Sequence, residues 1–280
     1  MSIPADSAGA VSATTETASG PVTVTVGTGS ETKTDGVLAA DGSVAYDASG
    51  STDHTVQATT DGFRIHTVIA DAAGDTEIKH DVTLPAGTRL VAEKDMPESA
   101  SMDPGAEVSG AVFIVDSAGK VVGGFSAPWA KDANGADIAT RYEVRSGSLV
   151  QIVDHKAQAT AYPVVADPYL GFSLISSARW VWHSGAGWTF EVTPTGWARW
   201  NAGGYLPGVF GWDELYSKYR YRGLNTNLDG MRDQWICHQQ VVAVRSPNKA
   251  TWNLDEWRPN VSYLQTINAS CNPGGTKWFD

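Results

Sequence analysis

The 280-residue sequence predicts a mainly β protein, in which an N-terminal antiparallel β-sandwich or meander precedes a small, tryptophan-rich α+β domain. Apolar and polar residues alternate with a period of two through much of residues 54–155, and turns that contain glycine interrupt them at short intervals. No convincing helical periodicity occurs before residue 160. Ten of the eleven tryptophans follow residue 170. This length corresponds to about two domains.

Residues 1–50 are expected to be a flexible segment with one strand. The first twenty residues are of low complexity, rich in Ser, Thr, Ala and Gly, and predict disorder. Residues 21–26 then alternate as a half-buried strand does. Another loose stretch, 27–51, follows it.

Residues 51–161 are expected to form an acidic, all-β accessory or pro-region domain. Short turns such as Asp61-Gly62 and Ser146-Gly147 suit tight hairpins, because glycine adopts the positive φ that these turns need. A series of such hairpins is typical of a sandwich or barrel. The predicted hairpins join 54–60 with 63–70, 111–115 with 120–126, and 138–145 with 148–155, and residues 78–84 alternate as a further strand.

Residues 162–170 are expected to be an extended linker, because Pro163 and Pro168 disfavour a helix in the residues before them. Charge also changes near this point. Residues 1–165 contain ten Lys and Arg against twenty-two Asp and Glu, a net charge of −12, whereas residues 166–280 contain ten against nine, a net charge of +1. The acidic half would repel nucleic acid, so we expect no nucleic-acid partner. The difference in charge also favours contact between the two halves, although a solvated acidic surface explains it equally well.

Residues 171–280 are expected to mix strands and helices. Aspartate and glutamate at the start of 212–220 favour a helix there. The tail from residue 251 is expected to be irregular and to need a covalent cross-link to hold it in place. The predicted elements are strands at 180–184, 188–192 and 195–200 and helices at 212–220 and 228–242.

Two cysteines, Cys237 and Cys271, bear on the cellular compartment. In an exported protein they would form one disulfide, and in a cytosolic protein two buried thiols. The chain shows no signal peptide at its start and no apolar run long enough to cross a membrane. It is therefore either cytosolic or the mature form of a secreted protein that carries an added initiator Met, and we favour the secreted form.

His238 is the strongest candidate for a catalytic group. With an acidic partner, Asp233 or Glu256 (Asp255 is a further choice), it would act as a general base, although a structural histidine is the alternative. Cys237 is a poor nucleophile for it, since adjacent helical residues point about 100° apart. The sequence contains no phosphate-binding, dinucleotide, zinc-protease or hydrolase motif, and we expect no cofactor and no metal. Residues 132–137 resemble part of a calcium loop but lack its final glutamate.

The aromatic residues of the second half are candidates for ligand binding. Tryptophans two positions apart lie on one face of a strand, and exposed indoles stack on sugar rings. The basic run after Tyr219 adds positive charge for an anionic polymer or lipid headgroup. Burial of most of these aromatics in the core, and a solvated helix end for the basic run, are the alternatives. The candidate ligand-binding residues are Trp180, Trp182, Trp252, Trp257, Tyr219, Arg220 and Arg222.

Several segments resemble known families. Residues 127–135, 140–144 and 162–168 resemble a β-rich region that precedes different C-terminal domains in secreted actinobacterial proteins. Residues 194–199, 212–215, 234–238, 252–254, 257–259 and 271–273 resemble DUF2599, a secreted domain family of unknown function. The resemblance implies export and a Cys237–Cys271 disulfide in the second domain, and it supplies no catalytic residue.

The sequence supports three hypotheses for the function. The first is a secreted effector, an antibacterial protein or toxin, whose domain 171–280 acts on the envelope polymer or lipid of another bacterium. The second is a module that binds cell-wall glycan without catalysis. The third is a secreted hydrolase that uses His238.

Overall fold

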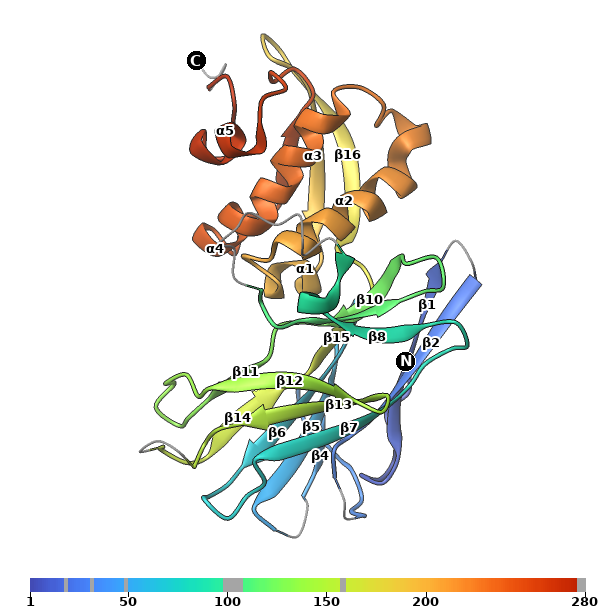
Figure 1. Cartoon of the computed structure of the whole chain (residues 1–280), viewed down its shortest axis with the longest axis vertical. Helices are drawn as coiled ribbons and strands as arrows, with labels where there is room; N and C mark the ends of the chain where they lie inside the picture. Colours follow the sequence, from blue (N-terminus) through green and yellow to red (C-terminus); the bar gives the residue numbers. More distant parts are fainter. Residues whose placement is uncertain (18–19, 31–32, 48–49, 98–107, 157–159, 276–280) are drawn as a thin grey trace. The chain divides into compact units, whose positions relative to one another are not determined.

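The chain folds into two compact units, which meet in the sequence between Phe172 and Ser173. The computed structural model describes residues 1–17, 20–30, 33–47, 50–97, 108–156 and 160–275 (Figure 1). Unit 1 consists of the described residues up to 97 and from Gly110 to Phe172, and unit 2 consists of residues 108–109 and those from Ser173 onward. The predicted fold class is confirmed, because antiparallel sheets dominate the chain and its helices lie almost entirely in unit 2.

Unit 1 contains two antiparallel sheets that share one core. Strands β14 (Val164–Asp167) and β11 (Trp129–Lys131) extend the larger sheet, because β14 pairs with both β6 (Gly62–Ile69) and β11. A short 3-10 helix, η1 (Glu93–Asp95), follows β8. The five-stranded sheet contains, in spatial order, β1 (Ala10–Thr17), β2 (Gly20–Gly27), β7 (Glu77–Thr83), β13 (Ser148–Val153) and β12 (Thr140–Arg145). The larger sheet contains β3 (Val37–Leu38), β4 (Val44–Tyr46), β5 (Thr52–Ala58), β6 (Gly62–Ile69), β15 (Tyr169–Gly171), β10 (Val121–Phe125), β9 (Val112–Val115) and β8 (Arg89–Ala92), with β11 (Trp129–Lys131) and β14 (Val164–Asp167).

The core of unit 1 lies between these sheets. Val24 and Val26 of the smaller sheet belong to one buried cluster with Phe63 and Ile65 of the larger sheet. Full burial of side chains of this size stabilises a fold by roughly 1.5–3 kcal/mol each. Buried residues alternate with more exposed ones in β2, β5, β6 and β7, which is the pattern that the sequence shows, whereas β9 and β13 are buried throughout.

The three predicted hairpins are confirmed. Strands β5 and β6 pair around Asp61-Gly62, β9 and β10 pair around residues 116–119, and β12 and β13 pair around Ser146-Gly147. Ser146 and Gly147 have φ angles of 51° and 86°, the left-handed values that a two-residue hairpin requires.

The N-terminal segment contains more strands than the one expected. Strands β1 and β2 pair along their whole length, and β3 and β4 form a second short pair. Disorder of the first twenty residues is therefore wrong for the part that the structure describes. This segment is ordered because Val11 and Ala13 are buried in the core of the sandwich, although the surrounding sequence is of low complexity.

Residues 162–170, expected as a linker, contribute strands to the larger sheet. The X-Pro segments are extended, as predicted, but the extended backbone of β14 and β15 pairs with β6 instead of running free. The division between the units falls a few residues later, after Phe172.

Unit 2 contains a three-stranded antiparallel sheet with helices packed on one face. Phe190 of the central strand contacts Tyr219 of helix α2 (Tyr205–Tyr219), and Trp252 of the edge strand contacts Trp235 of helix α3 (Leu228–Cys237). The sheet order is β16 (Ile175–His183), β17 (Gly187–Pro194) and β18 (Trp252–Asp255). The helices are α1 (Gly196–Trp200), α2 (Tyr205–Tyr219), the 3-10 helix η3 (Arg220–Arg222), α3 (Leu228–Cys237), the π-helix η4 (His238–Val242), α4 (Ala243–Arg245) and α5 (Tyr263–Asn268).

Strands β16 and β17 overlap the predicted strands, although β16 begins five residues before the predicted 180, and α3 and η4 together span the predicted helix 228–242. The strand predicted over 195–200 is wrong, because Thr195 begins helix α1 by accepting a hydrogen bond from the Ala198 N–H at its hydroxyl. Helix α2 begins seven residues before the predicted 212. The tail contains β18 and α5, so it is more regular than expected. No helix in the described ranges combines the length and the apolar character needed to span a membrane.

Candidate functional site

A disulfide joins helix α3 to the tail of unit 2. Cys237 and Cys271 are bonded, with their Cα atoms 5.5 Å apart and 34 positions apart in the sequence. Both are fully buried. The predicted pairing is confirmed, and it holds the last described segment against α3.

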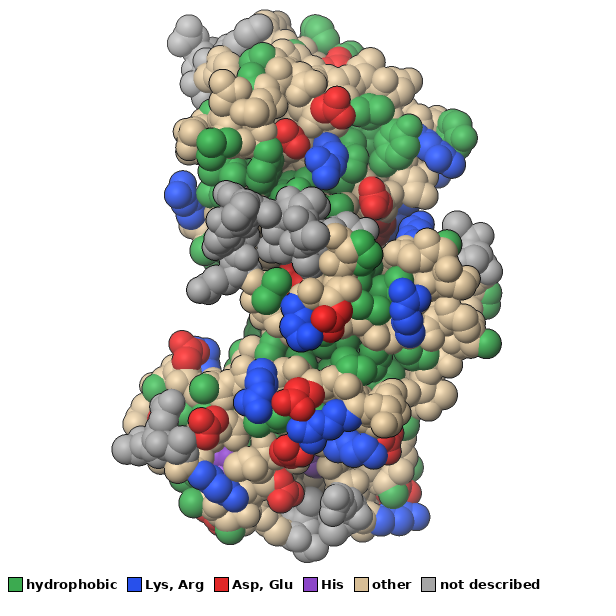
Figure 2. All heavy atoms as spheres, viewed as in Figure 1, with side chains coloured by type: hydrophobic (Ala, Val, Ile, Leu, Met, Phe, Trp, Pro, Cys, Tyr) green, Lys and Arg blue, Asp and Glu red, His purple; other side chains and the backbone are tan. Residues whose placement is uncertain are grey.

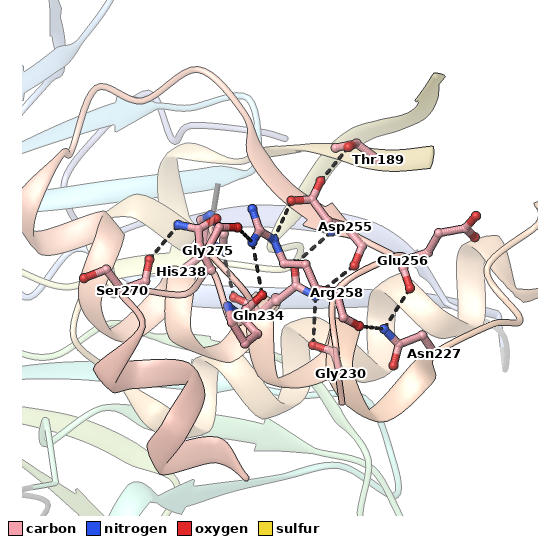
Figure 3. Close-up of polar contacts among 12 residues, drawn as sticks. Thr189, Asn227, Gly230, Gln234, His238, Asp255, Glu256, Arg258, Ser270 and Gly275 are labelled. Atoms are coloured by element: carbon pink, nitrogen blue, oxygen red, sulfur yellow. Dashed lines mark hydrogen bonds and ion pairs between the residues drawn. The ribbon is translucent and has the colours of Figure 1, made fainter. Parts of the chain in front are cut away.

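A buried polar network makes a second connection to the tail (Figure 3). Arg258 forms an ion pair with Asp255 at 2.6 Å, and both side chains are almost completely buried. The Arg258 guanidinium also donates to the carbonyl oxygens of Pro273 and Gly275. Gln234 of α3 bonds to the backbone N–H and carbonyl of Asp255. Because these contacts satisfy the buried charges, we interpret this network as structural.

His238 lies at the end of α3 and is 2% exposed. Its Nδ1 bonds to the carbonyl oxygen of Gln234, and its ring stacks on Trp252 with centroids 6.2 Å apart. Burial, and to a smaller degree the charge of Lys249, lowers the pKa of His238 to about 3. The ring is thus neutral and shielded from solvent, which is unfavourable for a general base that must reach a substrate.

The predicted acidic partners lie elsewhere. Asp233 pairs with Arg232 at 3.6 Å, and burial raises its pKa. The carboxylate of Glu256 accepts a hydrogen bond from the Thr226 hydroxyl. Within the described ranges, neither carboxylate is bonded to His238, so the structure does not bring the three candidate catalytic residues together.

The candidate aromatic residues divide by exposure. Trp252 is fully buried. Trp257 is half-buried and lies against Gly187, where an added Cβ would be 3.1 Å from the indole. Tyr219 is half-buried, and its hydroxyl accepts a hydrogen bond from the Ala178 N–H. Trp182 is 58% exposed, which makes it the most exposed tryptophan in the described part of the chain.

Trp188 joins Trp182 in an exposed pair at the end of the β16–β17 hairpin. The two residues lie opposite each other in the strand register. Their ring centroids are 5.3 Å apart with planes at 67°, and Trp188 is 43% exposed. Trp188 is not among the ligand-binding residues that the sequence predicted. The glycines at 185 and 187 predict a tight turn, and such a turn places Trp188 opposite Trp182.

A basic edge, defined as Arg220, Tyr221 and Arg222 of η3, adjoins this pair. Trp180, two residues before Trp182 on the same face, donates from its indole N–H to the carbonyl oxygen of Arg222 at 3.1 Å. Tyr221 is 87% exposed. Figure 2 shows hydrophobic side chains beside Lys or Arg side chains on the surface of unit 2. Trp180 therefore lies against η3, the segment that contains Arg220 and Arg222, and Trp182 follows two residues later on the same strand face, whereas Trp252 belongs to the core.

The comparisons with known proteins match part of the chain. Residues 175–274 match the model of DUF2599, described as a protein family of unknown function, so the predicted resemblance is confirmed for unit 2. Uncharacterized proteins of Mycobacterium tuberculosis and Mycobacterium bovis are 49% identical over 45 residues, which are 16% of this chain and 30% of each relative. An uncharacterized protein of Mycobacterium leprae is 31% identical over 68 residues, 24% of this chain and 55% of that relative.

The matched residues thus span less than two thirds of these relatives. No solved structure matches the chain.

Proposed function

We propose that the protein is a secreted envelope-binding protein whose unit 2 binds cell-wall glycan through Trp182 and Trp188. The exposed tryptophan pair is the observation that carries this proposal. A flat indole face packs well on the apolar face of a sugar ring. The two planes lie at 67°, so the two indoles present their faces in different directions.

The burial pattern supports a binding role for this pair. The core of unit 2 already contains Trp235 and Trp252 as a fully buried pair. The hairpin pair is therefore not needed to fill the core, and exposed aromatic groups of this kind mark ligand surfaces.

The disulfide supports export. Disulfides persist in oxidising compartments and are rare in the cytosol. An exported protein that binds envelope glycan fits the second hypothesis for the sequence. It also fits an antibacterial effector, for which glycan binding would supply the targeting step. The hydrolase hypothesis has less support, because His238 is neutral and buried.

The test measures binding of the full chain to purified bacterial sacculi by co-sedimentation. Trp182→Ala combined with Trp188→Ala should abolish most of the binding. Trp200→Ala is a matched control, since Trp200 is 39% exposed and lies in α1, which follows the end of β17 that is about 20 Å along the strand from Trp188.

Two outcomes contradict the proposal: absence of binding by the unaltered chain, and equal binding by the double variant. Growth inhibition of related bacteria, measured in parallel, distinguishes an antibacterial effector from a module that only binds the envelope. Inhibition that disappears in the double variant supports the effector, and binding without inhibition supports the module.

A further inference from the structure

Two guanidinium groups beside the tryptophan pair have no carboxylate partner. Within the described residues, neither Arg220 nor Arg222 lies within ion-pair distance of an acidic side chain. Glu256 is not an ion-pair partner of either arginine, and its carboxylate instead accepts a hydrogen bond from the Thr226 hydroxyl. Four other cations of unit 2 form ion pairs: Arg179 with Glu191, Lys218 with Glu214, Arg232 with Asp233, and Arg258 with Asp255. Among the described residues, Arg199, Arg245 and Lys249 also lie outside ion-pair distance of a carboxylate, and Arg199 donates instead to the carbonyl oxygens of Pro247 and Ala250.

Aromatic rings orient both guanidinium groups. Arg220 lies over the ring of Tyr221 at 4.8 Å, and Arg222 lies over Tyr219 at 5.8 Å. A guanidinium that stacks by its face keeps its N–H groups available at its edge, in the geometry that binds phosphate or carboxylate oxygens in pairs. Stacking also reduces the conformational freedom that each side chain would lose on binding.

The fold fixes the basic edge next to the tryptophan pair. The hydrogen bond from Trp180 to the carbonyl oxygen of Arg222 ties η3 to β16. Gly223 ends η3 with φ of 94°, and a Cβ there would lie 2.9 Å from the Trp180 indole nitrogen. Trp182 follows Trp180 on the same face of the strand at about 7 Å. A ligand that stacks on Trp182 is therefore within reach of the arginines.

We propose that the ligand of this surface is an anionic glycan, in which the tryptophan pair stacks on a sugar ring and Arg220 and Arg222 bind phosphate or carboxylate groups of the same polymer. This inference rests on the proposed function, and it adds the chemical class of the glycan. The charge of the ligand then resides in the polymer and not in a lipid headgroup.

The experiment compares the full chain with Arg220→Gln combined with Arg222→Gln, again by co-sedimentation with sacculi. Charged hydrogen bonds of this kind predict a loss of affinity of at least about tenfold. Binding by the unaltered chain should weaken as sodium chloride rises from 0.05 to 0.5 M, because salt screens exposed charges, and the double variant should lose this dependence. Arg245→Gln is the control, because it removes one exposed positive charge from α4, outside the basic edge, and this variant should bind normally.

Sacculi treated with hydrofluoric acid, which removes phosphodiester-linked polymers, distinguish the two anions. Lost binding identifies phosphate, whereas retained, salt-sensitive binding identifies carboxylate, and either supports the inference. Binding that changes neither with salt concentration nor with the arginine substitutions overturns the inference. So does binding to phosphatidylglycerol vesicles without binding to sacculi.

The tryptophan and arginine variants separate the two proposals. If the Trp182 and Trp188 variant loses binding while the arginine variant binds normally, the glycan proposal stands and the anionic inference fails. If neither variant loses binding, both fail. Circular dichroism of each variant checks that the fold is retained.

Discussion

Trp182 and Trp188 face each other across the β16–β17 hairpin, with centroids 5.3 Å apart and both indoles substantially exposed. Trp235 and Trp252 form a pair of nearly the same separation, 5.0 Å, but both are completely buried. The two pairs therefore differ in their surroundings much more than in their geometry. Burial should decide how much each pair stabilises unit 2.

The first prediction compares these pairs. Trp252→Ala should lower the free energy of unfolding of unit 2 by about 3–5 kcal/mol, because it leaves a large cavity. Trp182→Ala should lower it by about 1 kcal/mol or less, because the indole is mostly in contact with water. Denaturant unfolding followed by tryptophan fluorescence measures both. Similar losses for the two variants would mean that the hairpin pair is part of the core.

Local patterns predicted the hairpins of unit 1 because turn and strand signals agree there. Asp61-Gly62 and Ser146-Gly147 each fix a turn, and alternation on both sides fixes which face is buried. Burial of Val11 could not be predicted in this way. It depends on β1 pairing with β2 and packing on distant strands, which low-complexity composition conceals.

Helix α2 shows a different reason for a missed boundary. Its first turns contain Pro207, Gly208 and Gly211, residues that lower helix propensity. The structure explains both glycines, since an added Cβ would lie 3.1 Å from Ile236 at Gly208 and 2.8 Å from the Trp235 indole at Gly211. Close packing on α3 thus outweighs local propensity, and no local pattern reveals it.

For the candidate site, the sequence predicted one ligand-binding group that contains Trp180, Trp182, Trp252 and the arginines of η3. The structure places Trp180 against η3 and Trp252 in the core. Strand periodicity places Trp180 and Trp182 on one face. Which of the tryptophans the helices cover depends on where α3 crosses the sheet, and Trp252 lies under Trp235. Exposure is therefore a tertiary property that composition cannot predict.

The second prediction concerns the disulfide. Replacing Cys237 and Cys271 with Ser should lower the free energy of unfolding of unit 2 by about 3–4 kcal/mol, from the chain entropy of a loop of this length. Urea unfolding followed by NMR amide signals reports the two units separately, so unit 1 is an internal control. A loss shared equally by unit 1, or no loss in unit 2, would contradict the prediction.

The third prediction concerns Arg258. Arg258→Ala should destabilise unit 2 by about 3–5 kcal/mol, because it leaves the Asp255 carboxylate buried without its partner and frees the tail carbonyls. Arg179→Ala breaks the exposed pair with Glu191 and should cost about 1 kcal/mol or less. Thermal unfolding of both variants tests the contrast. If Arg258→Ala unfolds like Arg179→Ala, the network does not hold the tail.

The fourth prediction is the pH dependence of unit 1 and concerns three of its buried groups with shifted pKa values. Burial lowers the pKa of His54 to about 3 and that of His80 to about 4. The two rings lie close together, since both Cε1 atoms are within 3.2 Å of the position of a Cβ on Gly29. Asp167 is shifted the other way, because burial raises its pKa to about 7, against the opposing effects of Arg64 and Trp129.

On acidification, the histidine shifts lower the free energy of unfolding of unit 1, whereas the Asp167 shift raises it. As pH falls from about 6.5 to 4, the unfolded chain gains protons at His54 and His80 that the folded unit does not accept, so each histidine lowers the free energy of unfolding by about 1.4 kcal/mol per pH unit. Over much of the same range the folded unit binds a proton at Asp167 that the unfolded chain lacks, which adds about 1.4 kcal/mol per unit. From these three groups we expect a net loss of about 1.4 kcal/mol per pH unit on acidification.

Substitutions separate these contributions in the full chain. Asp167→Asn should stabilise unit 1 at pH 7.5, where the buried carboxylate is charged, and should steepen the acid loss to about 2.8 kcal/mol per pH unit. His80→Asn should flatten the loss, and His183→Asn, which lies in unit 2, should leave it unchanged. Urea unfolding at pH 4.5 to 7.5, followed by NMR signals of unit 1, measures these slopes. A slope that Asp167→Asn does not alter would show that this carboxyl does not take up a proton over that range in the folded unit.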